Sequence, residues 1–398
     1  MVLAAATFTQ AASGFFVQGI GAMGVHLRDD LDLSAAQLGL LLSAAQLAPL
    51  AGLLVAGELL DRYDERWVVG AGACVVAASL AAGSLAPGYA ALLLVLLVVG
   101  AGYSTVQPGG SKSVASWFDT SRRGLAMGIR QAGLPLGGVL AAAVLPALAA
   151  SAGWRATLVA GAAVAFLGAI IFMSFCRRPP FPLASEAETR GAGAAAGGRL
   201  RLLREPAMVR ILVSGTSLVA VHSGIGALTV LHLHETASLA PGTAALVFVA
   251  VQAAGAAGRI YLAAWSDRSR SGTSDRHRRS GRYSSVLTCL VAVAVGLAAL
   301  ATPAGHSPVA ASLLFVWLGF FGIGWYGPWV AHLAESAPPG RTGFALGSAM
   351  AVNQIAIILT PPALGLLNDA SHGFAPAWSL LAALSATALA LTIRTPRP

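Results

Sequence analysis

Long apolar runs separated by short polar turns dominate this chain. Read between turn signals, they predict twelve helices, each able to supply the roughly 20 apolar residues that cross a bilayer core. Prolines such as Pro87, Pro241, Pro303 and Pro308 fall in or beside the connections, where a missing backbone donor costs least. The predicted spans are 3–26, 35–60, 67–86, 89–116, 124–150, 155–177, 208–231, 241–264, 284–303, 309–333, 342–367 and 374–394.

Composition supports an integral membrane protein. Of the 398 residues, 56% are hydrophobic and 10% are charged, whereas soluble domains carry roughly 25% charged residues. An ordinary soluble enzyme is therefore excluded. The three cysteines, Cys74, Cys176 and Cys289, lie in or beside apolar runs and are interpreted as packing residues. No basic leader with a cleavage site precedes the first apolar run, so we expect the first span to be retained.

The positions of the basic residues predict the orientation. With the N-terminus in the cytoplasm, 23 of the 25 Lys and Arg lie at the inner side, and only Arg28 and Arg155 lie outside. This bias follows the positive-inside rule and supports an even number of spans. The net charge of +9 is thus explained by topology and by anionic lipid, without a nucleic-acid partner. We expect a multi-pass protein of the cell membrane with both termini cytoplasmic.

A segment rich in Ala, Gly, Pro and Arg divides the spans into two sets of six. It begins after the sixth span and is interpreted as a flexible cytoplasmic linker. The predicted domains are an N-terminal six-helix bundle (1–177), the linker (178–207) and a C-terminal six-helix bundle (208–398).

Two sequence pieces recur in the two halves. Asp61-Arg62 follows the second span, in GELLDRYDERW, and Asp267-Arg268 follows the eighth. The piece RRGLAMG at 122–128 opens the fifth span, and RTGFALG at 341–347 opens the eleventh. Both halves therefore share one plan, as in transporters built from parallel repeats with a site between the halves.

These features resemble the major facilitator superfamily. Its loop signature is filled here by Gly57, Asp61, Arg62 and Arg66, with Asp64 in place of the usual second Gly. The resemblance covers essentially the whole chain and implies an all-α membrane protein of twelve transmembrane helices in two pseudo-symmetric six-helix bundles. The stretch SVASWFDTSRRGLAMGIRQAGLPLGG further resembles bacterial members that carry small anions, of the monocarboxylate or the cyanate and nitroimidazole type.

The resemblance also implies a cytoplasmic gate. In this interpretation Gly57, Asp61, Arg62, Arg66, Asp267 and Arg268 form ion pairs and helix-terminus contacts that break when the inner side opens. The alternative is that these charges are solvated and only anchor helix ends at the interface. Small residues of the fifth span, Gly133, Pro135, Gly137 and Gly138, resemble part of a motif of drug and proton antiporters, and close helix packing explains them equally well.

Polar side chains inside spans are the candidate substrate site, because burying them in lipid is costly. Most fall on spans that line the cavity in the family or support it. They are Gln18, Gln46, Tyr103, Gln107, Arg130, Gln131, His222, Gln252, Trp325, Tyr326, Asn353 and Gln354.

Arg130 is the leading candidate of this set. It lies about 10 Å into the fifth span, and the repeat sets it opposite Ala349. Its guanidinium could hold a carboxylate with two parallel hydrogen bonds, or it could reach back to the interface. Lys112 lies nearer the end of its helix, so we interpret its ammonium group as extending to the membrane interface. His222 could relay a proton, donate to a substrate or be satisfied by a neighbouring helix. Asp and Glu are absent from the middle of every span.

The predicted function is secondary active or facilitative transport of a small organic anion, for example a monocarboxylate, by alternating access. A proton-coupled exporter of drug-like or antibiotic compounds is the alternative within transporters, and a non-transporting receptor or sensor is the alternative of another class. No catalytic constellation, nucleotide-binding loop or metal-ligand cluster is found in the sequence, so neither an enzyme nor a cofactor is predicted. The expected partners are a small anion, a coupling proton and the lipid bilayer, with the protein acting as a monomer.

Overall fold

The computed structural model is helical throughout the residues that it describes. These are 1–20, 27, 30–33, 35–119, 121–176, 204–268, 275–338, 340–371 and 373–393, and no strand occurs among them. The predicted linker therefore lies almost wholly outside the described residues.

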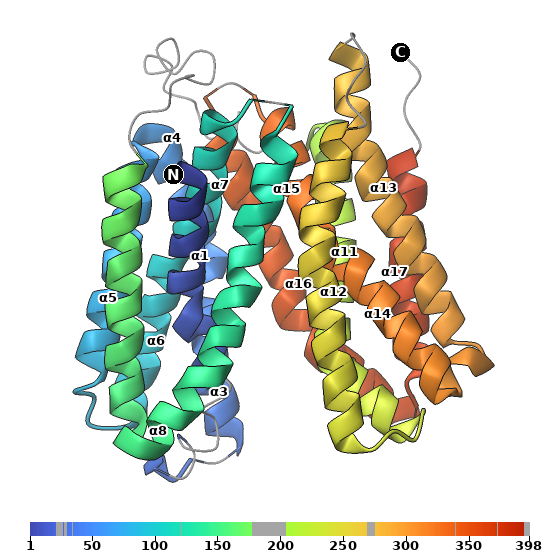
Figure 1. Cartoon of the computed structure of the whole chain (residues 1–398), viewed down its shortest axis with the longest axis horizontal. Coiled ribbons are helices and arrows are strands. Elements are labelled where there is room, and N and C mark those ends of the chain that lie inside the picture. Colours follow the sequence, from blue (N-terminus) through green and yellow to red (C-terminus); the bar gives the residue numbers. More distant parts are fainter. Residues whose placement is uncertain are drawn as a thin grey trace. The chain divides into compact units, whose positions relative to one another are not determined.

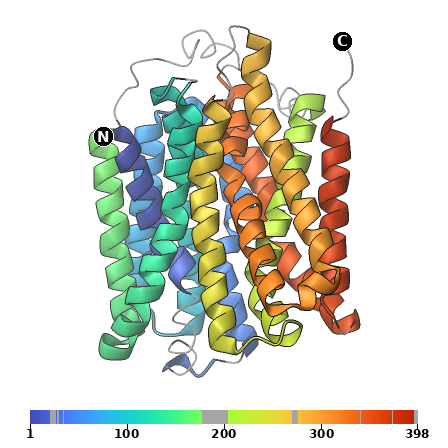
Figure 2. The same ribbon diagram turned by 45° about the vertical axis from the view of Figure 1, so that its right-hand side comes forward.

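The helices of the first half follow the first six predicted spans (Figure 1). They are α1 (Val2–Gly19), α3 (Ala35–Leu47), α4 (Pro49–Arg62), α5 (Glu65–Gly83), α6 (Tyr89–Tyr103), α7 (Val106–Trp117) and α8 (Arg123–Phe175). The last of these contains two spans, because Gly153, at φ 79° and ψ 165°, leaves the helical conformation. Figures 1 and 2 show α8 reversing direction between its teal first part and its green second part.

The helices of the second half follow the remaining six spans. They are α11 (Pro206–Glu235), α12 (Pro241–Arg268), α13 (Asp275–Leu300), the short 3-10 helix η2 (Pro303–His306), α14 (Pro308–Gly324), α15 (Tyr326–Ser336), α16 (Thr342–Ser371) and α17 (Ala375–Ile393). Pro241, Pro303 and Pro308 open their helices, as expected of residues that lack an amide donor.

Nine helices in the described ranges are long and apolar enough to cross a membrane. They account for ten of the predicted spans, since α8 contains two. The first two spans correspond to α1 and to the pair α3 and α4. The twelve-span prediction is confirmed.

Three spans that the sequence predicted as continuous are interrupted in the structure. The breaks fall at Ala48, at Ser104–Thr105 and at Trp325. A proline follows each break within four residues, namely Pro49, Pro108 and Pro328. Proline removes one intrahelical hydrogen bond and its ring clashes with the carbonyl four residues earlier, which explains the breaks.

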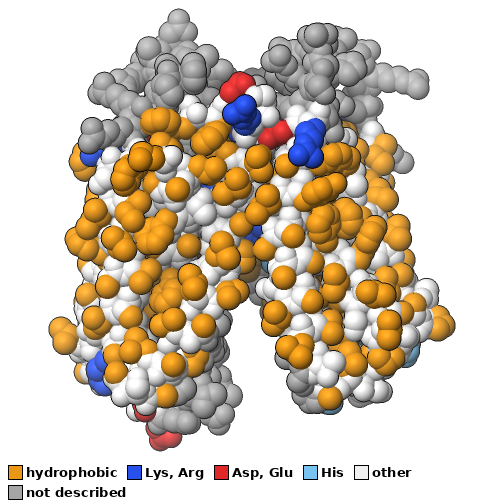
Figure 3. Space-filling model, viewed as in Figure 1, with side chains coloured by type: hydrophobic (Ala, Val, Ile, Leu, Met, Phe, Trp, Pro, Cys, Tyr) orange, Lys and Arg blue, Asp and Glu red, His pale blue; other side chains and the backbone are white. Residues whose placement is uncertain are grey.

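Apolar side chains form both the interior and the outer surface of the helices. The core of the first half includes Phe16, Leu80 and Leu96, each at most 2% exposed. Large apolar side chains also remain exposed, such as Leu94, Val139 and Leu313, each at least 64% exposed. Figure 3 shows hydrophobic side chains spread over the visible sides of the helices, as expected of a surface that faces lipid.

Contacts divide the chain into two compact units. Unit 1 contains Met1–Asp119, Ile129–Gly193 and Ala337–Gln354, and unit 2 contains Thr120–Gly128, Ala194–Ser336 and Ile355–Pro398. Each unit therefore takes in the beginning of one helix from the opposite sequence half, α16 in unit 1 and α8 in unit 2. The domain boundaries predicted from the sequence, 1–177, 178–207 and 208–398, stay a prediction.

Candidate functional site

In unit 1, Asp61 caps the beginning of α16. Its Oδ1 accepts a hydrogen bond from the amide of Gly343 at 2.7 Å, and its Oδ2 accepts one from the amide of Phe344 at 2.8 Å. The first amides of a helix have no intrahelical partner and carry partial positive charge, so a carboxylate stabilises them. Gly57 allows this approach, because a Cβ there would lie 2.7 Å from the Gly343 carbonyl oxygen.

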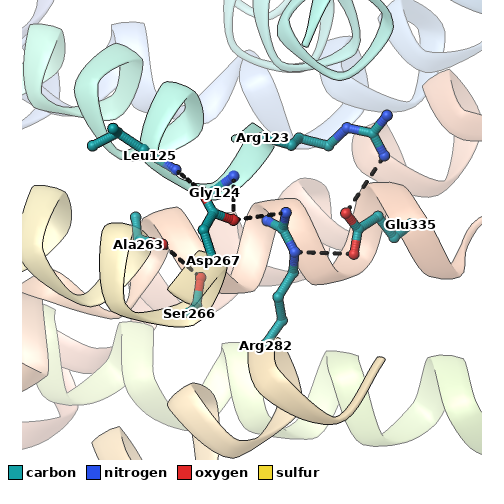
Figure 4. Close-up of polar contacts among 8 residues, drawn as sticks. All are labelled: Arg123, Gly124, Leu125, Ala263, Ser266, Asp267, Arg282 and Glu335. Carbon is teal, nitrogen blue, oxygen red and sulfur yellow. Dashed lines mark hydrogen bonds and ion pairs between the residues drawn. The ribbon is translucent and has the colours of Figure 1, made fainter. Parts of the chain in front are cut away.

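In unit 2, Asp267 caps the beginning of α8 in the same way. Its Oδ1 accepts from the amide of Gly124 at 3.0 Å and its Oδ2 from the amide of Leu125 at 2.7 Å (Figure 4). Two pieces recur in the sequence, Asp-Arg and Arg-x-Gly. In each contact the Asp of the first piece caps the helix that the second piece opens. We call the contacts of Asp61 and of Asp267 the two helix caps.

The two caps have different charged neighbours. In unit 2, Arg282 lies between two carboxylates, with NH2 3.1 Å from Asp267 Oδ1 and Nε 3.0 Å from Glu335 Oε2. Arg123 adds a contact of 3.5 Å to Glu335 (Figure 4). In unit 1, Lys112 Nζ lies 3.3 Å from Glu65 and donates to the Leu60 carbonyl at 2.5 Å.

The sequence did not predict these ion pairs. Lys112 was expected to snorkel, Arg123 and Arg282 counted only toward the basic bias, and Glu335 was not a candidate. The four side chains are at most 12% exposed, and charged groups are seldom so buried unless paired. The sequence signal that could have predicted these ion pairs is the position of Glu65 and Glu335, each near a helix end where basic residues also gather.

The remaining predicted gate residues have other surroundings. Arg62 is 63% exposed and lies 3.9 Å from Glu58 on the same helix. Arg66 lies over the ring of Trp67 at 4.9 Å, and Arg268 is exposed at the end of α12. Asp64, which departs from the family signature, accepts from the Arg66 amide at 2.9 Å and serves as the N-cap of α5. A short N-capping residue is favoured there, so the departure has a local explanation.

Arg130 is fully buried in unit 1 and donates to neutral oxygens. Its NH1 bonds Ser111 Oγ at 2.8 Å, and its NH2 bonds Gln10 Oε1 at 2.6 Å, the Val106 carbonyl at 2.9 Å and the Gln107 carbonyl at 3.0 Å. The two carbonyls belong to the first turn of α7, directly after the break in the fourth span. Arg130 therefore joins α1 and α8 to the interrupted helix.

Two of the other candidates of unit 1, Gln46 and Gln354, contact each other. Gln354 donates from Nε2 to the backbone oxygen and Oε1 of Gln46, at 2.9 and 3.2 Å, and so joins α16 to α3. Asn353 and Gln131 are buried. Tyr103 ends α6 and Gln107 lies in the first turn of α7. Gln18 lies in α1, and its side chain is outside the described part of the structure.

In unit 2, Arg259 on α12 is buried, as Arg130 is in unit 1. It is 4% exposed, and its Nε donates to the Ile323 carbonyl at 3.2 Å, just before the break at Trp325. Its guanidinium carbon lies 6.0 Å from the centre of the Tyr326 ring. The helices meet closely here, because a Cβ on Gly258 would collide with the Phe320 carbonyl. In the sequence, Arg259 counted only among the basic residues of the inner side and was not a candidate site residue.

Aromatic residues follow Ile323 in the interrupted tenth span, and one of them, Tyr326, lies beside Arg259. Trp325 and Tyr326 have ring centres 5.0 Å apart, and Trp329 lies 5.4 Å from Trp325. Trp329 donates to the Ile211 carbonyl at 2.9 Å. The indole N–H of Trp325 is buried and has no hydrogen-bond partner among the described residues. We call Arg259, Trp325 and Tyr326 the donor cluster.

His222 and Gln252 complete the candidates of unit 2. Both are half-buried, on α11 and α12 respectively. Val221, the residue before His222, packs against the tenth span, because a Cβ on Gly322 would lie 3.4 Å from Val221 Cγ1. Among the described residues, no group of three or more His, Cys, Asp or Glu side chains that could hold a metal ion is found.

Comparison with known proteins identifies the class. The model of the Major Facilitator Superfamily matches residues 6–361. The chain belongs to this superfamily of membrane transporters.

The relatives include carriers of small acids. A hexuronate transporter of Bacillus subtilis is 26% identical over 44% of this chain and 42% of its own length, so this chain spans less than half of that relative. A probable L-galactonate transporter of Escherichia coli is 32% identical over 32% of this chain and 28% of its length. An uncharacterized MFS-type transporter of Mycobacterium tuberculosis is 26% identical over 93% of this chain and 79% of its length.

Solved structures support the same fold. The proton:xylose symporter XylE has a TM-score of 0.73 at 14% identity and covers 98% of this chain and 94% of its own. The Escherichia coli fucose:proton symporter FucP has a TM-score of 0.73 at 16% identity and covers 98% of both chains. At this identity the likeness shows the twelve-helix transporter fold alone.

Proposed function

We propose that this protein carries a small organic anion across the cell membrane by alternating access, with sugar acids and related hydroxylated carboxylates as the substrate class. Both termini would lie in the cytoplasm. The observation that carries the proposal is the donor cluster of unit 2, in which every polar group can donate a hydrogen bond.

The chemistry of the donor cluster favours an anion. Arg259 can offer parallel N–H groups to a carboxylate, Trp325 has a buried N–H, and Tyr326 has a phenol. A cation would gain nothing from the guanidinium and would require a carboxylate instead. The sequence places Asp and Glu only at the ends of the predicted spans. Hydroxyl groups on the substrate would match the phenol and indole donors.

The relatives agree with this class of substrate. The names of the two acid carriers above and of a probable sulfoacetate transporter of Cupriavidus necator refer to hexuronate, L-galactonate and sulfoacetate, each the anion of an acid. Each of these matches covers less than half of this chain, so they support the substrate class without fixing the substrate.

We assign Arg259, in place of Arg130, as the principal anion ligand. Arg130 donates hydrogen bonds to the backbone and side chains of its own unit, and its side chain is fully buried. Its proposed role is to hold the first turn of α7 after the proline break. The two helix caps are proposed as the cytoplasmic gate: they form when the inner side is closed and break when it opens.

A binding test separates this proposal from its alternatives. The melting temperature of the purified protein is measured with glucuronate, galactonate, sulfoacetate, neutral glucose and a panel of cationic drugs. A ligand at 100 times its Kd stabilises the folded state by about 2.7 kcal/mol. We expect glucuronate or galactonate to raise the melting temperature and glucose, which lacks the carboxylate, to leave it unchanged. Stabilisation by the drugs and by none of the acids would favour an exporter and contradict the proposal.

A further inference from the structure

His232 is buried near the end of α11, and both of its ring nitrogens have partners in unit 2. Nε2 lies 3.0 Å from the carbonyl oxygen of Gly305 in η2, and Nδ1 lies 3.1 Å from the indole nitrogen of Trp378 on α17. An indole N–H can only donate, and a carbonyl oxygen can only accept. His232 is therefore neutral, donates its Nε2 proton to Gly305 and accepts the Trp378 N–H at Nδ1. We call these two contacts the His232 latch.

Aromatic rings enclose the imidazole of the latch. The ring centres of Phe315, Phe374 and Trp378 lie 5.3, 5.3 and 5.9 Å from that of His232, each in an edge arrangement. Trp378 is fully buried, and His232 is 2% exposed. A second proton, on Nδ1, would point at the Trp378 N–H, which cannot accept it. The site thus fits the neutral imidazole and conflicts with the imidazolium.

Ionisable groups of the surrounding elements do not offset a charge on His232. The helices α14 and α17 contain no Asp, Glu, Lys, Arg or His, and those of α13 lie at its opposite end, before Ser284. Among the described residues, no carboxylate contacts His232. The nearby ionisable residues are His234 and Glu235 of α11 and His306 of η2, all exposed, together with Asp369 and His372, whose side chains are outside the described part.

The latch joins three separate parts of unit 2. Gly305 belongs to η2, which connects α13 to α14, and Trp378 belongs to α17. The carbonyl of His232 also accepts the amides of Thr236 and Ala237, at 2.9 and 3.2 Å, where the chain leaves α11. Loss of the side-chain contacts would therefore release this end of α11 from η2 and α17 together.

We propose that the His232 latch is an acid-sensitive switch at this end of unit 2, which faces the outer solution in the proposed topology. Protonation of Nδ1 sets the N–H groups of His232 and Trp378 against each other, so the latch opens. The open form binds a proton with the ordinary affinity of histidine, half-saturated near pH 6.5. Because the closed form excludes that proton, the open fraction grows about tenfold for each pH unit well below this value. The switch is independent of the proposed anion site.

Hydrogen exchange of the Thr236 and Ala237 amides tests the switch, because both bond the His232 carbonyl. Purified wild-type protein and His232→Asn are compared at the same pH, so the intrinsic pH dependence of amide exchange cancels. Asparagine keeps an acceptor for Trp378 and takes up no proton. Between about pH 7.5 and about pH 5.5, the exchange rate of the wild type relative to this variant is expected to rise about tenfold. His306→Gln and His234→Gln, changes of exposed histidines, are the controls and should follow the wild type.

Exchange that changes alike with pH in the wild type and in His232→Asn would overturn the proposal. A rise that persists in His232→Asn and disappears in His306→Gln would overturn it as well. Should His232→Asn fail to fold, nitrogen NMR of the wild-type protein with isotope-labelled histidine and tryptophan decides the question. At about pH 7.5 the proton of His232 should reside on Nε2, and acid should shift the indole N–H resonance of Trp378. The opposite tautomer, or an indole resonance that stays constant, would overturn the proposal.

Discussion

The Nε of Arg259 donates to the Ile323 carbonyl at 3.2 Å, two residues before the tenth span breaks at Trp325. Arg130 makes the corresponding contact in unit 1, where it donates to the Val106 and Gln107 carbonyls just after the break in the fourth span. A buried arginine thus binds the backbone at the proline break in each sequence half. The predictions below separate the proposed roles of these two residues.

Removal of the indole donor should weaken substrate binding and cost the fold no hydrogen bond. The Trp325 N–H has no partner among the described residues, so Trp325→Phe removes no protein hydrogen bond. We expect the affinity for glucuronate to fall by about 1 kcal/mol, the usual value of one hydrogen bond. The melting temperature should fall less than in the control, because only the volume of the larger ring is lost from the core. Trp329→Phe is the matched control. It loses the bond to the Ile211 carbonyl, so it should lower the melting temperature and leave the affinity unchanged.

Arg130→Met should destabilise the protein. The substitution keeps an apolar stem but leaves Gln10 Oε1 and the Val106 carbonyl without their donor, and each buried acceptor left unsatisfied costs about 1 to 3 kcal/mol. Chemical unfolding in detergent measures this loss. The control is Arg62→Met, at a side chain that is 63% exposed, where the change should stay within about 0.5 kcal/mol. Wild-type stability together with lost transport in Arg130→Met would instead make Arg130 a substrate ligand.

The two helix caps should differ in strength. Asp61→Ala removes a capping carboxylate, which costs about 1 kcal/mol. Asp267→Ala also removes one of the carboxylates of the buried Arg282, so we expect a larger loss of about 3 kcal/mol. The free energy of unfolding of both variants gives the comparison. Asp64→Asn is the control, since asparagine serves equally well as an N-cap. Equal losses for the two alanine variants would contradict the role assigned to Arg282.

Close packing beside Arg259 should be needed for transport. A Cβ on Gly258 would collide with the Phe320 carbonyl and lie 3.2 Å from Gly324 Cα. Gly258→Ala must therefore push α12 away from α14, at a cost of about 1 to 3 kcal/mol, and displace Arg259. We expect a strong loss of glucuronate counterflow. Gly226→Ala, where a Cβ would meet nothing within 4 Å, should transport normally, and the same result for Gly258→Ala would show that Arg259 tolerates the shift.

The sequence was sufficient to predict the fold. Spans are set by the length of apolar runs, and no water in the bilayer core can replace a backbone hydrogen bond, so such runs become helices. The recurring pieces Asp-Arg and Arg-x-Gly also identified both partners of each cap, although the sequence could not show that they contact each other. The prolines that follow the breaks were present in the sequence, and their effect on the fourth and tenth spans was not predicted.

The site was only partly predictable, because depth along a helix does not determine what a side chain contacts. Arg130 and Arg259 lie at similar distances from their helix ends, and sequence reasoning selected Arg130 as a ligand and assigned Arg259 to the interface. The pair of Arg282 with Glu335 and the pair of Gln46 with Gln354 join residues far apart in the chain. Such contacts depend on how the helices pack, which no local pattern records.

The affinity of Arg259→Gln for glucuronate tests the central claim most directly. Titration calorimetry on purified wild-type and variant protein, with Arg62→Gln as the exposed control, gives both Kd values. Loss of a buried charged partner costs at least about 2 to 3 kcal/mol of binding, so we expect the Kd to rise by about 100-fold while the melting temperature without ligand stays close to that of the wild type. A folded Arg259→Gln variant that binds glucuronate as tightly as the wild-type protein would contradict the account.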